Sequence, residues 1–186
     1  MNKLSKEQLW SYFILVARVL LAWTLLHYGW GKLVGDQFGV HEATLNKALK
    51  DVDLLSLSWY LADHEPFKSF IGSSQIIAAL LILYNRTVLV GALMAIPIWL
   101  TILMWDLTFM GWYTPFTIRL PFYLLLTFLI LWHQKGKVVL ALALLTQKRG
   151  SRRSYPLWAY MLLPVLAICL EFVGALPSAL LQLFRK

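Results

Sequence analysis

The feature that most constrains this chain is a series of five apolar segments, each close to the length that crosses a lipid bilayer. A helix needs about 20 residues to span roughly 30 Å of hydrocarbon. The segments lie at residues 9–28, 67–84, 88–105, 115–132 and 155–172. The sequence therefore predicts an all-α, polytopic transmembrane helix bundle with a four-helix core and a fifth, C-terminal helix.

The composition excludes the main alternatives to a membrane protein. Of the 186 residues, 60% are hydrophobic and 14% are charged, and the mean hydropathy is +0.67. A soluble domain is about half apolar and a quarter charged, and a disordered chain has low hydrophobicity. We therefore expect a single membrane domain over residues 1–186, with the lipid bilayer as its main environment.

The charges in the connecting segments predict how the chain is oriented. Residues 133–154 contain six Lys and Arg residues and no acidic residue, whereas residues 33–69 contain six acidic and three basic residues. Cytoplasmic loops of membrane proteins carry an excess of Lys and Arg. We expect the N-terminus and the 133–154 loop in the cytoplasm, and the 33–69 loop outside.

The outer loop at 33–69 is long for a small bundle. Within it, Leu45, Ala48, Leu49 and Val52 recur at helical spacing, which is typical of an amphipathic helix. We expect a short amphipathic helix there, lying on the membrane surface or acting as a lid.

The sequence lacks the residue patterns of nucleic-acid, disulfide and metal sites. The net charge of +8 comes from residues at the ends of apolar segments, so we expect no nucleic-acid partner. One cysteine, Cys169, cannot form an intramolecular disulfide or a CxxC pair. The four histidines are scattered over both predicted membrane faces and the outer loop, so we expect no metal site and no intrinsic cofactor.

Polar residues inside the apolar segments are the candidates for a ligand-binding site, because such residues are costly in a membrane and often functional. Arg18 lies in the middle of the first segment. The others fall near the predicted outer ends of the helices and are His27, Lys32, Gln75, Asp106, Arg119 and Glu171. Three interpretations remain open: an interhelical clamp, a site for a polar or quinone-like ligand, or side chains that reach the headgroups. For Arg18 a further alternative is that it pairs with a carbonyl and holds helices together. None of these residues is assigned a catalytic role.

Several short motifs lie between residues 10 and 133. They are Arg18 followed by GWGK at 29–32, Gly72 with QIIAALL at 75–81, RT at 86–87, GAL at 91–93, and WDLTF at 105–109. Together they resemble the DoxX-like family of integral membrane proteins (DoxX, DoxD and MauE types).

The resemblance implies a four-helix bundle in the bacterial cytoplasmic (inner) membrane, associated with redox complexes. It also implies quinone as a ligand and other membrane or periplasmic subunits as partners. Two features depart from the family, namely the long first loop and the fifth apolar segment. Only Arg18, Lys32, Gln75 and Asp106 carry over, as matching polar positions.

Three functions follow from these observations. The first is a subunit of a quinone-linked oxidoreductase complex with a polar site near the outer leaflet. The second is a scaffold subunit without a ligand, whose polar network holds the helices. The third is a small anion carrier, which is weakened by the lack of an inverted repeat. The surroundings of Arg18 distinguish these functions. A pocket around Arg18 that opens to lipid or to the outer face favours the first, a tightly packed and paired Arg18 favours the second, and a continuous polar path to the cytoplasm favours the third.

Overall fold

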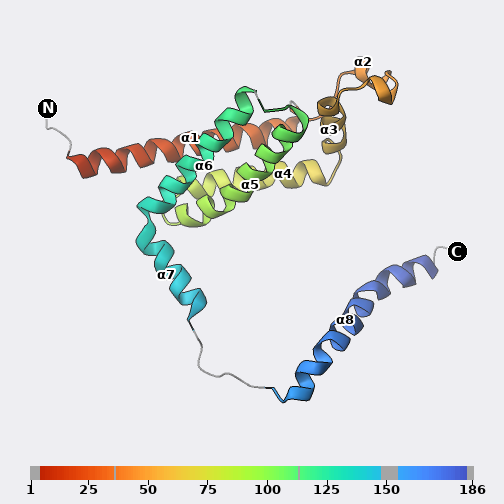
Figure 1. Cartoon of the computed structure of the whole chain (residues 1–186). Helices are drawn as coiled ribbons and strands as arrows, with labels where there is room; N and C mark the ends of the chain where they lie inside the picture. Colours follow the sequence, from red (N-terminus) through yellow and green to blue (C-terminus); the bar gives the residue numbers. More distant parts are fainter. Residues whose placement is uncertain (1–4, 36, 113, 148–154, 184–186) are drawn as a thin grey trace. The chain divides into compact units, whose positions relative to one another are not determined.

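The computed structural model describes residues 5–35, 37–112, 114–147 and 155–183, and for residues 174–183 it describes the backbone alone. These residues form helices and no strand (Figure 1), which confirms the predicted all-α class. The elements are α1 (Lys6–Val34), α2 (Glu42–Leu45), η1 (Leu49–Asp51), α3 (Leu54–Ala62), α4 (Phe67–Leu83), α5 (Val88–Phe109), α6 (Pro115–His133), α7 (Lys135–Thr146) and α8 (Leu157–Leu183). The chain divides into two units, Met1–Leu145 and Thr146–Lys186.

The first unit contains a bundle of α1, α4, α5 and α6. Each of these helices packs against two others, in the order α1, α4, α5, α6 and back to α1 (Figure 1). The largest fully buried side chains come from all four helices and include Leu21, Ile82, Trp99 and Ile130. Burying side chains of this size is the main energetic gain of packing in any bundle.

The local sequence explains where α1 and α6 begin. Ser5 accepts a hydrogen bond from the backbone N–H of Gln8 at 3.2 Å, and the Gln8 side chain accepts one from the backbone N–H of Ser5 at 2.9 Å. This reciprocal pair satisfies two donors at the start of α1. Thr114 and Thr117 form the same arrangement at α6, where Pro115 occupies a position that needs no N–H donor.

Glycines allow the helices of the bundle to approach closely. A Cβ atom on Gly29 of α1 would lie 2.7 Å from the carbonyl oxygen of Gly72 on α4. A Cβ atom on Gly91 of α5 would lie 2.6 Å from the backbone nitrogen of Ile82. Small residues that permit such contacts are typical of helix packing in membranes.

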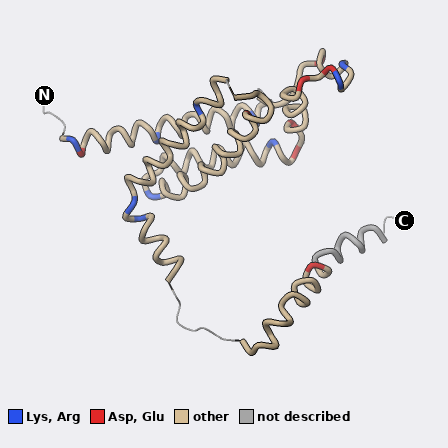
Figure 2. Tube along the Cα trace, in the orientation of Figure 1, with Lys and Arg blue, Asp and Glu red and all other residues tan. Residues whose placement is uncertain are grey.

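The structure supports a multi-pass membrane protein. Three helices, α1, α5 and α6, are long and apolar enough to cross a bilayer, and the α3–α4 pair, bent by 85°, can count as a fourth span. Large apolar side chains also cover the outer surface, such as Trp23 at 69% exposure and Phe70 at 69%. Charged residues are sparse along the bundle helices and frequent in the segment between α1 and α4 (Figure 2).

The helix boundaries differ from the expected segments at three places. The short helix of the first long loop is α3, which begins after Asp53, whereas the 45–52 stretch contains only the end of α2 and η1. The Asp53 carboxylate accepts a hydrogen bond from the backbone N–H of Ser56 at 2.8 Å, and this bond lowers the pKa of Asp53. Much of the basic 133–154 segment is helical as α7, and α8 extends past residue 172, where the fifth expected segment ends.

We expect Gly91→Ala to destabilise the bundle. Its new methyl group would meet the backbone of Leu81 and Ile82, which cannot move aside as a side chain can. Overpacking of this kind costs about 1–3 kcal/mol, so the midpoint of thermal unfolding in detergent should fall. Gly136→Ala is the matched control, because a Cβ atom there meets nothing within 4 Å. Equal midpoints for the two variants would contradict the close packing of α5 on α4.

Candidate functional site

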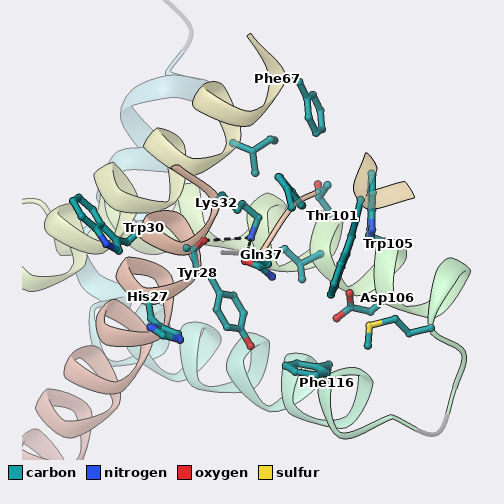
Figure 3. A pocket seen from close by; sticks show the side chains of 16 residues that line it. His27, Tyr28, Trp30, Lys32, Gln37, Phe67, Thr101, Trp105, Asp106 and Phe116 are labelled. Carbon is teal, nitrogen blue, oxygen red and sulfur yellow. Dashed lines mark hydrogen bonds between the residues drawn. The ribbon is translucent and has the colours of Figure 1, made fainter. Parts of the chain in front are cut away.

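A pocket of about 390 Å³ lies at the end of the bundle where α1 and α5 end and α4 and α6 begin (Figure 3). This volume falls within the range of small-molecule sites, about 300–1,000 Å³. Ring-bearing side chains make up much of its wall: His27, Tyr28, Trp30, Phe38, Trp59, Phe67, Trp105 and Phe116. The pocket therefore offers flat apolar surfaces around a small number of polar groups.

The turn that follows α1 shapes one wall of this pocket. Gly35 adopts a left-handed conformation with φ of 85°, and its backbone N–H donates to the carbonyl oxygen of Gly31. Glycine accepts this conformation without a steric penalty, which is why it commonly ends helices. The backbone N–H of Gln37 also donates to Gly31, at 3.3 Å. The chain therefore folds back and places Gln37 beside the last turn of α1.

Lys32 is a buried cation in the wall of the pocket. Its side chain is 4% exposed, and its Nζ donates to Oε1 of Gln37 at 2.8 Å and to the carbonyl oxygen of Tyr28 at 3.5 Å. The Nζ also lies 5.4 Å from the ring centroid of Tyr28 and 5.2 Å from that of Phe38. Acceptors and aromatic faces partly offset the large cost of burying an ammonium group.

Asp106 is the opposite charge in the same pocket. It is 9% exposed, and its carboxylate has no hydrogen bond or ion pair with any residue that the structure describes. Asp106 and Lys32 interact electrostatically, but they do not form an ion pair. Figure 3 shows both side chains in the pocket. Because Asp106 sits in the last turn of α5, the helix dipole also opposes its charge.

The unfavourable position of Asp106 indicates a role other than stability. The Asp106 carboxylate receives no hydrogen bond from the described protein atoms, so only water or a ligand in the pocket can satisfy it. Groups held in this way are typical of functional sites. Asp106 and Lys32 are therefore the central polar groups of the candidate site.

Two further polar groups near this end of the bundle are buried without a partner among the described residues. Gln75 on α4 is 1% exposed and packs close to Gly29, and its Oε1 accepts no hydrogen bond there. The indole Nε1 of Trp105, in the pocket wall, has no acceptor among the same residues. Leaving such a group unpaired costs about 1–3 kcal/mol. Gln75 is not part of the pocket wall.

Arg18 lies away from the pocket, contrary to the grouping expected from the sequence. Its guanidinium donates to the carbonyl oxygens of Ile82 at 3.0 Å and Leu83 at 2.7 Å, and to Oδ1 of Asn85 at 2.8 Å. Fourteen residues separate Arg18 from Lys32, which is about 21 Å along a helix. Arg18 therefore caps the C-terminal end of α4, as the carbonyl-pairing alternative for this residue stated.

The remaining candidates do not complete a charged network. His27 is exposed at the edge of the pocket. Arg119 is exposed on α6 and forms no ion pair with Asp106, and the ion pair that the described residues do form joins Lys68 to Asp63 at 3.0 Å. Glu171 is exposed on α8, in the second unit. The interhelical clamp considered above therefore does not form between Asp106 and Arg119, whose side chains do not come within ion-pair distance.

Sequence reasoning missed part of the pocket wall. Tyr28, Trp30 and Trp105 were interpretable as an aromatic belt at the headgroup level, which is a common role for such residues. Gln37 and Trp59 come from the long segment between α1 and α4. The unusual length of that segment was the available signal, because long connections often carry functional residues.

We compared the chain with protein-family models, with curated proteins and with solved structures, and no match was found in any of the three comparisons. The resemblance to the DoxX-like family therefore stays a prediction.

We expect Arg18→Met to lower the stability of the bundle without removing the pocket. The substitution removes the donors that satisfy the last carbonyl oxygens of α4, and hydrogen bonds of charged groups contribute about 1.5–3 kcal/mol. Thermal unfolding in detergent measures the loss. Arg86→Met is the matched control, because Arg86 is an exposed arginine in the turn that follows α4. If both variants unfold at the wild-type temperature, the capping role of Arg18 is wrong.

Proposed function

We propose that this chain is a DoxX-like integral membrane subunit that binds a quinone-type ligand in the pocket between Lys32 and Asp106. The observation that carries the proposal is the pair of opposite charges that share an aromatic pocket without neutralising each other. In a structural ion pair the Lys32 and Asp106 side chains would contact each other. A ligand with polar groups on both sides of a ring could instead lie between them and contact both.

The residues present fit a quinone. Its flat ring suits a wall rich in aromatic side chains, which favour stacked and edge-to-face contacts. The Lys32 ammonium would donate to an oxygen on one side of the ring, and the Asp106 carboxyl group would face the oxygen on the other side. A bound quinone would supply the capacity to carry two electrons and two protons between partners. Lys32 would position the ligand, and Asp106 would accept or return a proton.

The resemblance and the pattern of charges support the wider setting. We propose a multi-pass protein of the bacterial cytoplasmic membrane, with the N-terminus and the basic 133–154 segment in the cytoplasm. The pocket would then open near the outer leaflet, at the end of the bundle that carries the acidic 33–69 segment. The electrons would come from other membrane or periplasmic subunits, which makes the protein one part of a redox complex.

A second candidate is a scaffold subunit that binds no ligand. The hydrogen bonds of Arg18 to the end of α4 favour it, because they join two helices and serve no pocket. The two candidates differ in one measurable property, which is whether the pocket binds a small molecule.

We expect the purified protein in nanodiscs to bind ubiquinone-1, and Lys32→Met to weaken that binding by tenfold or more. Trp30, Trp59 and Trp105 line the pocket, so quenching of tryptophan fluorescence reports occupancy. Tenfold in affinity corresponds to about 1.4 kcal/mol, which is a modest contribution for a hydrogen bond from a charged group.

Lys47→Met is the matched control for this titration, because Lys47 is an exposed lysine outside the pocket. The control should bind as the wild type does. Equal, non-saturable quenching in all three proteins would show only partition of ubiquinone-1 into lipid, and would leave the scaffold as the better function.

The proposed orientation predicts which introduced cysteines an impermeant reagent can label. With Cys169→Ser as background, Lys47→Cys should react with a membrane-impermeant maleimide in intact cells. Lys137→Cys, also an exposed lysine position, should react only after the cells are permeabilised. The opposite pattern would reverse the orientation.

A further inference from the structure

We propose that the pocket selects the reduced form of its ligand, a hydroquinone, over the oxidised quinone. This inference rests on the proposed function and adds the oxidation state that the site prefers. It comes from the unequal hydrogen-bonding capacities of Lys32 and Asp106, the two buried charged groups in the pocket wall.

Lys32 offers the ligand a donor and no acceptor. An ammonium group has three N–H donors, and Gln37 and Tyr28 accept from two directions. One donor remains beyond those described contacts. A quinone carbonyl and a hydroquinone hydroxyl both have lone pairs, so each can accept from Lys32. This side of the pocket therefore does not discriminate between the two oxidation states.

Asp106 offers the ligand acceptors and, when ionised, no donor. An ionised carboxylate has about four lone-pair sites, and no described residue donates to this one. A hydroquinone hydroxyl can donate to it in a charge-assisted hydrogen bond. A quinone carbonyl would instead place its own lone pairs against the carboxylate. Discrimination therefore arises on the Asp106 side.

The difference between the hydrogen-bonding capacities of Lys32 and Asp106 affects ligand binding because the two groups do not pair with each other. Lys32 and Asp106 form no ion pair, so the carboxylate oxygens of Asp106 remain available to accept a hydrogen bond from a ligand. A para-hydroquinone has hydroxyls at opposite ends of its ring, and one can accept from Lys32 while the other donates to Asp106. The quinone can satisfy only Lys32. Loss of one charge-assisted hydrogen bond in a buried site corresponds to about 10- to 100-fold in affinity.

The test measures which form the protein retains from a mixture. Nanodiscs of phosphatidylcholine and phosphatidylglycerol, with and without the protein, are dialysed under argon at about pH 7, where carboxyl groups are ordinarily ionised and lysine side chains are protonated. The dialysis buffer contains equal amounts of ubiquinone-1 and its hydroquinone. Chromatography of the extracted nanodiscs then gives the amount of each form retained above the empty nanodiscs.

We expect the wild-type protein to enrich the hydroquinone by tenfold or more. Asp106→Asn should reduce this ratio to near one, because a side-chain amide both donates and accepts and so serves both forms. Asp51→Asn, an exposed aspartate outside the pocket, should keep the wild-type ratio.

The outcomes separate this inference from the proposed function. If the wild-type protein retains both forms equally, or retains more quinone, the selectivity is wrong while the quinone site stands. If it retains neither form above the empty nanodiscs, the proposed function fails, and the selectivity fails with it. The wild-type ratio decides the point even if the Asp106→Asn protein does not fold.

Discussion

A charge inside a lipid-embedded bundle must find its partners within the protein, and this constraint organises the structure. Arg18 meets it with three hydrogen bonds, to two backbone carbonyl oxygens and a side-chain amide. Lys32 meets it with two acceptors and two aromatic rings. Asp106 has no hydrogen bond or ion pair of its own among the described residues. The contrast separates a residue that holds helices together from the residues that form a site.

The class of fold could be predicted because length and apolarity alone decide whether a segment suits a membrane. The segments at 67–84 and 115–132 nearly coincide with α4 and α6. The segment between α1 and α4 could not be predicted in detail, since the spacing of Leu45 and Leu49 resembles an amphipathic helix although both side chains are exposed, at 55% and 71%. The spacing of apolar residues indicates that they share one face of a helix, but it does not show whether another part of the protein packs against that face.

The site could be predicted only in part. Lys32, Asp106 and His27, three of the candidate residues, line one pocket because each lies at the same end of the bundle. Arg18 was grouped with them because it is a polar residue inside an apolar segment, yet a side chain in the middle of a span can turn toward whichever end offers carbonyl oxygens. Arg119 shares a depth with Asp106, but depth does not give the rotation of a helix. The aromatic wall could not be recognised from the sequence. Aromatic side chains are common both at the headgroup level and in a pocket at that depth, so their position in the sequence does not distinguish the two roles.

The shape of the pocket depends partly on Trp59, which lies outside the four bundle helices. It belongs to α3, which meets α4 at an 85° bend, whereas the two charges belong to the long helices α1 and α5. The backbone N–H of Gly39 donates to the carbonyl oxygen of Trp59 at 3.2 Å, so the segment that carries Gln37 is also tied to α3. The segment between α1 and α4 thus supplies part of the pocket wall and the amide that contacts Lys32, whereas both charges belong to the long helices. A change in the length of this segment would therefore alter the wall and the hydrogen bond to Lys32 while leaving both charged residues in the bundle.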